Sequence, residues 1–356
     1  MADEIMPMVV SVIPVLNEES TIIECLSSLC RQTYPYNRHK IMVLDGGSAD
    51  STRAVVEKYI ANNGPNSPEI SIHNNPGKYV AEARNLALQL VPNSTEYLIE
   101  VIGHCTVTKS HIETLVNKMT ALQSSTASPI GAVGVKVVAR EGNLGLVESW
   151  IEATLSSPLG SGGGQFENFS GTEKTKIPAF CLHSKKALED VDGWDNNFIT
   201  SQDSDLSMRL INAGYELYRT DEVSVKMAKR TTLPSWTKMS FRYGFWRTKL
   251  LKKHHRRVSL REFLPWFGFL LTVLLLITKQ NYWFLPGLIY LVALFFEGLR
   301  YAILSRNVSI VIGIPICMLI LHVFFSLGLV YGVFGKSRSY NAVSYTHLTL
   351  PTTMLV

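Results

Sequence analysis

The segment KIMVLDGGSADST, residues 40–52, joins a short apolar run to a turn that contains two carboxylates and two glycines. An apolar run of this length predicts a buried strand, and Ser and Asp before a helical pattern are typical of a helix start. The segment MVVSVIPVLNEES, residues 8–20, has the same order of apolar run, acidic turn and helical pattern. Two successive units of this kind predict a βαβ arrangement, in which neighbouring strands run parallel.

The same alternation continues to about residue 225. Helical patterns are expected at about residues 20–31, 51–61, 80–90 and 109–122, and the runs EISIHNN, EYLIEVIG and IGAVGVKVVA predict further strands. We therefore expect an α/β domain over residues 1–225 with a mostly parallel central sheet, whose ligands bind at the carboxyl ends of the strands. The Gly- and Ser-rich segment 156–176 is either a mobile active-site loop or a disordered connection.

The chain changes character after residue 262. Its mean hydropathy of +0.13 exceeds what a soluble globule needs, and the apolar runs between residues 263 and 335 predict two or three transmembrane helices. Residues 226–262 form a basic and aromatic arm: residues 226–261 hold 12 Lys or Arg and no Asp or Glu, whereas the rest of the chain holds 22 basic and 29 acidic residues. By the positive-inside bias, this arm lies on the cytoplasmic side, at the membrane interface.

The N-terminal residues and the cysteines indicate the compartment of the N-terminal domain. MADEIMPM has no basic n-region, and the apolar run after it is too short for a signal peptide, so the N-terminal domain is expected in the cytoplasm. Five cysteines without a Cys-x-x-Cys pair fit a reducing compartment.

The last residues, VSYTHLTLPTTMLV (343–356), are interpreted as a non-native tail and excluded from the fold.

Several strand ends carry groups that suit a nucleotide. The Asp45 carboxylate can accept hydrogen bonds from a base or a ribose, and the two glycines after it let the backbone approach a ligand. Neither GxxxxGK nor GxGxxG occurs at these turns, which disfavours a P-loop kinase or a nicotinamide site. Lys78 and Arg84 are either diphosphate ligands or surface charges. His104 follows a predicted strand and is either a structural residue or a metal ligand.

A second acidic motif lies in TSQDSDLSMRLINAGYEL, residues 200–217. Asp203 and Asp205 precede apolar residues at helical spacing, and a glycine follows. By themselves these features indicate a capped helix.

Taken together, the turns IPVLNEES, LDGGSADST, GKYVAEARN, IGHC, VDGWDNNF and SQDSDLSMRL resemble, in order and spacing, the family 2 glycosyltransferases with their GT-A nucleotide-sugar fold. The resemblance covers about residues 8–262 and is greatest to membrane-bound exopolysaccharide glycosyltransferases of the succinoglycan type. It implies a nucleotide pocket lined by Pro14, Asn17, Glu18 and Asp45, with Lys78 or Arg84 at the diphosphate.

The resemblance also implies roles in catalysis. Asp203 would be the base that deprotonates the acceptor hydroxyl, with Asp205 on the acceptor side in a supporting or capping role. The Asp-x-Asp motif that holds Mg²⁺ or Mn²⁺ in the family corresponds here to Ile102-Gly103-His104. The first Asp is therefore absent, and His104 is the candidate metal ligand.

The acceptor side is expected to use residues from two regions. Trp194 offers a flat face to a sugar, or packs in the core. Arg242 and Arg247, in the arm, could meet the phosphates of a lipid-linked glycan. A basic and aromatic segment directly before a membrane span favours lipid over nucleic acid as its partner.

The expected function is an inverting transfer of one sugar, from a UDP-sugar by preference, to a lipid-linked saccharide at the inner membrane by a multi-pass protein. A polyprenyl-phosphate glycosyltransferase is one alternative. A degenerate, non-catalytic membrane scaffold, suggested by Ile102, is another. No Gln-x-x-Arg-Trp occurs, which counts against a processive synthase.

Overall fold

The computed structural model describes residues 6–161, 166, 169–255 and 260–336. The predicted tail 343–356, parts of the segment 156–176 and residues 256–259 of the arm lie outside the described residues. The described chain divides into two compact units. The sheet unit comprises residues 6–140 and 169–228, and the helical unit comprises residues 141–161, 166 and 229–335 apart from the residues just excluded.

A nine-stranded sheet forms the centre of the sheet unit. Its strand order is β3-β2-β1-β4-β8-β6-β9-β5, and β7 pairs with β9. The pairs β1–β2, β2–β3, β1–β4 and β6–β9 are parallel, while β5, β7 and β8 pair antiparallel. The strands are β1 Met8–Val15, β2 His39–Asp45, β3 Glu69–Asn74, β4 Thr95–Glu100, β5 Cys105–Val107, β6 Ile130–Ala139, β7 Thr172–Lys174, β8 Leu182–Ser184 and β9 Glu216–Met227. The α/β fold with a mostly parallel sheet is confirmed.

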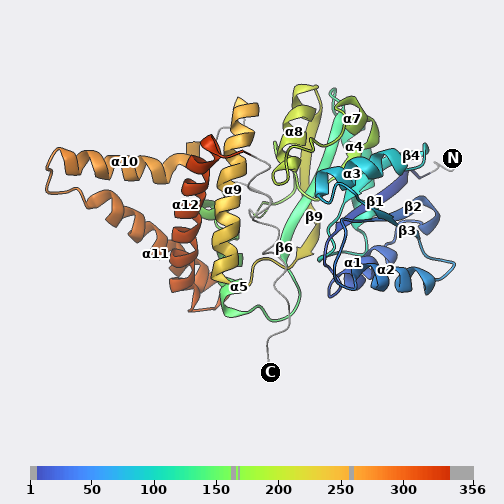
Figure 1. The fold of residues 1–356 in the computed structure, drawn as a ribbon, viewed down its shortest axis with the longest axis horizontal. Coiled ribbons are helices and arrows are strands. Elements are labelled where there is room, and N and C mark those ends of the chain that lie inside the picture. Colours follow the sequence, from blue (N-terminus) through green and yellow to red (C-terminus); the bar gives the residue numbers. More distant parts are fainter. Residues whose placement is uncertain (1–5, 162–165, 167–168, 256–259, 337–356) are drawn as a thin grey trace. The chain divides into compact units, whose positions relative to one another are not determined.

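Helices cover both faces of this sheet. α1 (Ile22–Cys30), α2 (Thr52–Ala61) and α4 (His111–Ser125) pack with the sheet in one apolar core. α3 (Val80–Leu90), α7 (Lys185–Asp190) and α8 (Gln202–Asn212) pack in the other. Figure 1 shows α1 and α2 on one side of the first strands and α3 on the other. A sheet buried on both faces explains why its strands read as continuous apolar runs.

Strand register brings the predicted turns to one edge. Val15 pairs with Asp45, and Asp45 pairs with Asn74, so β1, β2 and β3 end side by side. α8 leads into β9, which runs parallel to β6. Because a helix that precedes a parallel strand starts at the carboxyl edge, the first turn of α8 lies at that edge as well.

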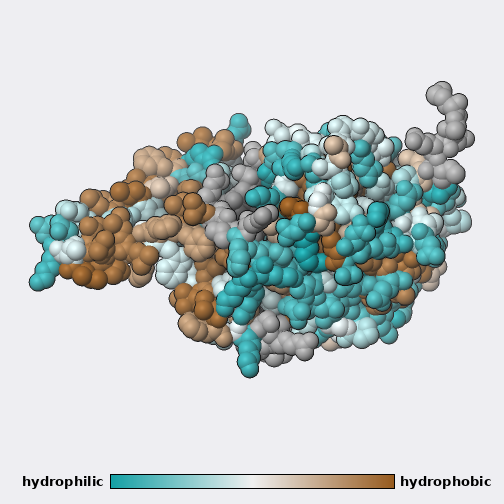
Figure 2. Space-filling model, turned by 90° about the horizontal axis from the view of Figure 1, so that it is seen from above, coloured by the Kyte–Doolittle hydropathy of each residue, from teal (hydrophilic) through white to brown (hydrophobic). Residues whose placement is uncertain are grey.

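The helical unit contains α5 (Leu146–Ser156), α6 (Pro158–Ser161), α9 (Leu233–Lys253), the short 3-10 helix η3 (Leu260–Phe263), α10 (Leu264–Ile277), α11 (Leu285–Ser305) and α12 (Ile310–Phe334). By length and composition α11 and α12, of 21 and 25 residues, could each cross a membrane, and α10 is a shorter apolar helix. Figure 2 shows a large apolar surface on these helices. α5 belongs to this unit and packs on α12 through Trp150, whose Nε1 donates to Ser309 Oγ at 3.0 Å.

Candidate functional site

The turns after β1 and β2 are joined by hydrogen bonds. The backbone N–H of Asn17 donates to Ser48 Oγ at 3.0 Å, and the N–H of Glu18 donates to Thr52 Oγ1 at 2.7 Å. In return Asn17 Oδ1 accepts from the N–H of Ala49 at 2.8 Å. The two strand-to-helix turns therefore form one polar rim, and Pro14 lies half-buried just before it.

Asp45 anchors this rim. Its Oδ1 accepts from the N–H and the Oγ of Ser48, at 2.9 and 2.7 Å. Its Oδ2 lies 3.8 Å from the Arg53 guanidinium. The side chain is 6% exposed. One carboxylate oxygen is therefore held by the turn, and the other lies beside a cation. A charged acceptor at a strand end, beside a glycine turn, suits the base or ribose of a nucleotide.

The loop before α3 closes the rim on another side. The N–H of Asn75 donates to the Asp45 carbonyl at 2.7 Å. A Cβ at Gly46 would lie 2.5 Å from the Lys78 carbonyl oxygen, so only glycine fits there. The Lys78 side chain is exposed, and its backbone has a positive φ of 70°. Lys78 is therefore a cation placed beside the polar rim and accessible to a ligand.

His104 lies at the same edge, in contact with the first turn. Its Nδ1 is 2.7 Å from Glu18 Oε1, and its side chain is 37% exposed. Ile102, at the position of the missing Asp, packs against the apolar core. His104 and Glu18 together offer one nitrogen and one oxygen donor, which fits a cation whose other ligands come from a diphosphate and water.

A different cluster has metal-type donors but does not fit a metal. Within the described part of the chain, Glu100, Cys181 and His183 form a buried group whose donor atoms lie within 4.8 Å of one another. Arg84 Nη1 lies 3.0 Å from Glu100 Oε1. The guanidinium already neutralises that carboxylate and would repel a cation.

Arg84 is thus placed differently from its expected role at the diphosphate. Its side chain is 7% exposed, and it pairs with Glu100 inside the protein. Burial by itself would raise the pKa of Glu100, but Arg84, His183 and Trp194 outweigh burial and lower this pKa to about 2. Glu100 is a residue that the sequence analysis missed. Its signal was a carboxylate between the apolar residues Ile99 and Val101, which in a buried sheet requires a cationic partner.

Asp203 lies in the first turn of α8, half-buried. Burial raises the pKa of the Cys181 thiol, and the nearby carboxylates of Glu100 and Asp203 raise it further. Cys181 is joined to the end of β4, because its carbonyl accepts from the Glu100 N–H at 2.9 Å. Asp203 therefore lies near the carboxyl end of β4. The preceding Ser201 has a left-handed φ of 65°, a costly backbone conformation of the kind that gathers at functional sites.

Asp205 is a positioning residue. It is fully buried, and its Oδ2 accepts from Arg209 Nε at 2.8 Å. Arg209 also donates to the carbonyls of Val191 and Gly193, which ties α8 to the turn before Trp194. A carboxylate with no exposed surface does not contact an acceptor, so the expected acceptor-side placement of Asp205 does not fit the structure.

Trp194 is a core residue as well. It is 3% exposed, and its ring lies 5.6 Å from the Arg84 guanidinium carbon. Asn85 holds its backbone, accepting from the Trp194 N–H at 2.8 Å and donating to the Trp194 carbonyl at 2.7 Å. The core alternative from the sequence therefore fits the structure, and a flat face presented to a sugar does not.

The remaining two predicted residues belong to the helical unit. Arg242 and Arg247 lie in α9, and Arg247 Nε is 3.2 Å from Glu262 Oε2. Their contact with an acceptor stays a prediction.

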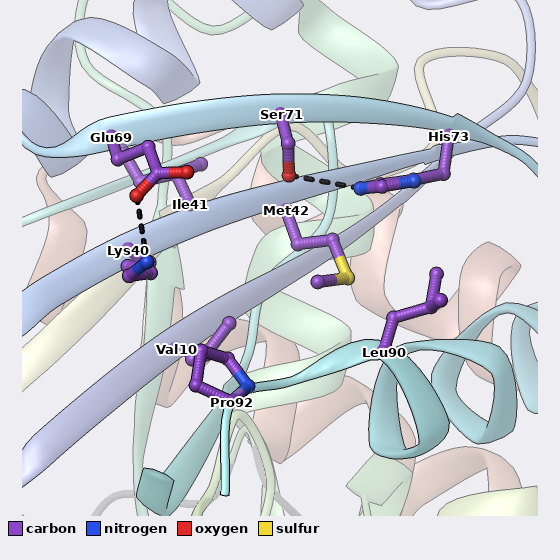
Figure 3. A pocket seen from close by; sticks show the side chains of 9 residues that line it. All are labelled: Val10, Lys40, Ile41, Met42, Glu69, Ser71, His73, Leu90 and Pro92. Carbon is purple, nitrogen blue, oxygen red and sulfur yellow. Dashed lines mark hydrogen bonds and ion pairs between the residues drawn. The ribbon is translucent and has the colours of Figure 1, made fainter. Parts of the chain in front are cut away.

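The cavity in Figure 3 lies away from the polar rim. Its lining includes Val10, Lys40, Met42 and Leu90, from the first half of β1, the start of β2 and the end of α3. Lys40 pairs with Glu69 of the neighbouring strand β3 at 2.7 Å. Because the rim is built at the opposite ends of β1 and β2, this cavity is not the candidate site.

Comparisons with known proteins bear on the family and the fold. Residues 11–134 match the family described as Glycosyl transferase family 2. The chain is 28% identical to the succinoglycan biosynthesis protein ExoA of Rhizobium meliloti (strain 1021), over 71% of this chain and 73% of that protein. It is 23% identical to the dolichyl N-acetyl-alpha-D-glucosaminyl phosphate 3-beta-D-2,3-diacetamido-2,3-dideoxy-beta-D-glucuronosyltransferase of Methanococcus voltae, over 92% of this chain and 98% of that protein.

A solved structure supports the fold. The mannosyltransferase PcManGT of Pyrobaculum calidifontis, solved with GDP-Man and Mn²⁺, superposes with a TM-score of 0.56 at 16% identity, covering 93% of this chain and 88% of that chain. Both the fold and the matched residues, which contain the two interlocked turns, lead to one conclusion. The chain carries a glycosyl transferase family 2 domain on a GT-A-like fold and is a glycosyltransferase.

Proposed function

We propose that this protein moves one sugar from a nucleotide-sugar donor, a UDP-sugar by preference, to a lipid-linked saccharide in exopolysaccharide or cell-surface glycan synthesis. The observation that carries the proposal is the position of Asp203. It lies in the first turn of α8, at the carboxyl edge of the sheet, and strand β2 ends in Asp45 at the same edge. The two similar proteins act, by their names, in succinoglycan biosynthesis and on a dolichyl-linked sugar. Both support an acceptor of this class.

The donor would be held by the rim. Asp45 and Asn17 would face the nucleoside, and Lys78, which is exposed, would supply a positive charge for the diphosphate. Glu18 and His104 would hold Mn²⁺ or Mg²⁺, the metal present in the PcManGT complex being Mn²⁺. When bound, such an ion stabilises the charge that develops on the departing diphosphate.

Asp203 would act on the acceptor. An alcohol is a weak nucleophile at neutral pH, and a positioned carboxylate that takes its proton in the transition state contributes ~10²- to 10⁴-fold in rate. The acceptor oxygen forms a bond to the anomeric carbon while the bond from that carbon to the diphosphate breaks. Because this is a single displacement, the configuration at the anomeric carbon inverts.

The helical unit would attach the enzyme to the membrane. We propose a multi-pass protein of the inner membrane with its catalytic domain in the cytoplasm, where nucleotide sugars are made. Arg242 and Arg247 in α9 then lie where the phosphates of a lipid-linked acceptor enter the headgroup region.

The test uses the purified full chain in lipid with radiolabelled UDP- and GDP-sugars. Two acceptors are compared, a lipid-linked saccharide and bare polyprenyl phosphate. Transfer to the saccharide is expected, and transfer to polyprenyl phosphate alone would favour the alternative enzyme. Asp203→Asn is expected to lower kcat ~10²- to 10⁴-fold with an unchanged KM for the donor.

Glu189→Gln is the matched control, because this carboxylate is exposed on α7. It should leave transfer at the wild-type rate. Wild-type activity in Asp203→Asn would remove the proposed base.

A further inference from the structure

Phe169 is a half-buried aromatic residue of the sheet unit, and its ring lies against two cations. The Arg219 guanidinium carbon is 4.2 Å from the centroid of the ring, and Lys136 Nζ is 5.7 Å from it. Lys136 Nζ also donates to the Phe169 carbonyl at 3.4 Å. A cation within ~6 Å of an aromatic centroid is attracted to the face of the ring. The ring and the backbone of Phe169 are therefore both held in place.

The chain that follows Phe169 is fixed to β9. The Gly171 N–H donates to Asp221 Oδ1 at 2.9 Å, and the Asp221 N–H donates to the Gly171 carbonyl at 3.3 Å. β7 begins at the next residue and pairs with β9, and Glu173 Oε1 accepts from Arg219 Nε at 2.7 Å. Because Glu173 neutralises Arg219, a phosphate would have to compete with a partner already present. The cations at the ring therefore support an aromatic surface rather than an anion site.

The ring lies on the face of the sheet that α8 covers. Successive residues of a strand point to opposite faces. On β6, Val135 packs in the core with α1 and α4, so Lys136 points to the other face. On β9, Leu217 packs in the core with α8, so Arg219, two residues later, points to the α8 face. Since the ring contacts both cations, Phe169 lies on this face as well.

Phe169 and Asp203 are at a similar height above the amino edge of the sheet. Asp203 is nine residues before Asn212, the last residue of α8, which corresponds to ~14 Å at ~1.5 Å per residue. Three residues join the end of α8 to the start of β9. Along β9, ~14 Å at ~3.3 Å per residue takes about four residues and reaches Thr220. Arg219, which contacts the Phe169 ring, is next to Thr220.

Across the sheet, the two residues are about two strands apart. Asp203 lies near the end of β4, and Lys136 is on β6. β8 lies between these strands, so at ~4.8 Å per strand the lateral distance is ~10 Å. A hydrogen bond of ~2.7 Å at Asp203 and a carbon contact of ~3.7 Å at the ring leave ~4 Å between them. A pyranose ring spans this distance.

A sugar also has the chemistry for this surface. One face of a pyranose ring carries C–H groups, which pack against an aromatic ring and leave the hydroxyls free for hydrogen bonds. Trp194, which was expected in this role, is 3% exposed, whereas Phe169 is only half-buried. Of these two aromatic residues, Phe169 is the one that a ligand can reach.

We propose that Phe169 is the aromatic face against which the acceptor sugar packs while its hydroxyl meets Asp203. This subsite rests on the proposed function, since it needs a saccharide acceptor and Asp203 as the base. Arg219 and Lys136 hold the ring in place. A bare polyprenyl phosphate has no sugar ring and would gain nothing from this contact.

Acceptor kinetics test the subsite in the full chain in lipid, with a lipid-linked saccharide and the nucleotide sugar that the enzyme uses. Phe169→Leu removes the ring but keeps an apolar side chain, and Phe169→Tyr keeps the ring. Phe169→Leu is expected to raise KM for the saccharide ~10-fold, a typical effect of losing a large aromatic contact, with kcat and the donor KM unchanged. Phe169→Tyr should retain the KM of the wild type.

Tyr36→Ala is the matched control. This aromatic residue is 45% exposed and lies in the 3-10 helix η1 (Tyr36–Arg38), directly before β2 and thus at the opposite edge of the sheet. Its loss should leave KM for both substrates at the wild-type values.

The outcomes separate the subsite from the proposed function. A wild-type KM for the saccharide in Phe169→Leu would overturn the subsite. A KM raised equally in Phe169→Tyr, or raised for donor and saccharide alike in Phe169→Leu, would also overturn it, because either result indicates a structural role of the ring. A wild-type enzyme that transfers sugar to bare polyprenyl phosphate alone would instead overturn the proposed function, and the subsite with it.

Discussion

Replacing Glu100 with Gln is expected to destabilise the sheet unit by several kcal/mol. The Glu100 side chain is 6% exposed, and it lies 3.0 Å from Arg84 and 3.2 Å from His183. Without the carboxylate, Arg84 keeps a buried charge that has lost its partner. Removal of one partner from a buried pair typically costs ~3–5 kcal/mol. This is a large fraction of the ~5–15 kcal/mol that stabilises a domain.

Arg84→Met should cost a similar amount, and the double variant should cost less than the two single variants together. The difference measures the coupling between the two residues, which reaches ~3 kcal/mol for residues in one network. The assay is urea unfolding of the full chain in detergent, followed by tryptophan fluorescence. Glu189→Gln, an exposed carboxylate, is the control and should change stability by less than ~0.5 kcal/mol.

The pH dependence of this pair follows from the lowered pKa of Glu100. Its folded pKa is about 2, against an ordinary value of 4.5. The stabilisation is complete above pH 4.5 and is lost as the pH falls from 4.5 to 2, an effect on the order of 3 kcal/mol. Glu100→Gln should not show this part of the acid dependence.

The structural role of Arg84 would be refuted if Arg84→Met unfolded like the wild type and had a raised KM for the nucleotide sugar. If Arg84 binds the donor diphosphate, as the family resemblance implies, this variant should unfold like the wild type and show a raised KM for the nucleotide sugar. A structural role predicts the reverse, a large loss of stability with a smaller effect on KM.

Three further variants probe the rim and its support. Gly46→Ala should weaken donor binding in a thermal-shift titration, because its Cβ would lie 2.5 Å from the Lys78 carbonyl oxygen; Gly64→Ala, with its nearest neighbour at 3.9 Å, should bind normally. Asp205→Asn should lower the free energy of unfolding by ~3 kcal/mol or more, since it leaves Arg209 without its buried carboxylate, and an unchanged Tm would contradict this. His104→Ala should abolish any rise in Tm on adding Mn²⁺, and a rise equal to that of the wild type would show that His104 is not a ligand.

Local pattern was sufficient to predict β1, β2, β3, β4 and β6 and the helices between them. Strands with apolar runs and helices with capping residues are encoded over about ten residues, so their order and the parallel sheet followed from the sequence. The turn at Asp45 was predictable for the same reason, since a turn after a parallel strand lies at the ligand-binding edge. The strands β5, β7, β8 and β9 were not predicted. Of these, β5, β7 and β8 have only three residues each, too few to show an alternation.

The roles of single side chains were decided by tertiary contacts. Arg84 and Trp194 look like site residues in the sequence, but Glu100 and Asn85, from a strand and a helix, hold them inside the core. The residues of a short segment determine its composition and its hydropathy. Burial and pairing depend on which distant segment packs against it, and only the folded chain determines that.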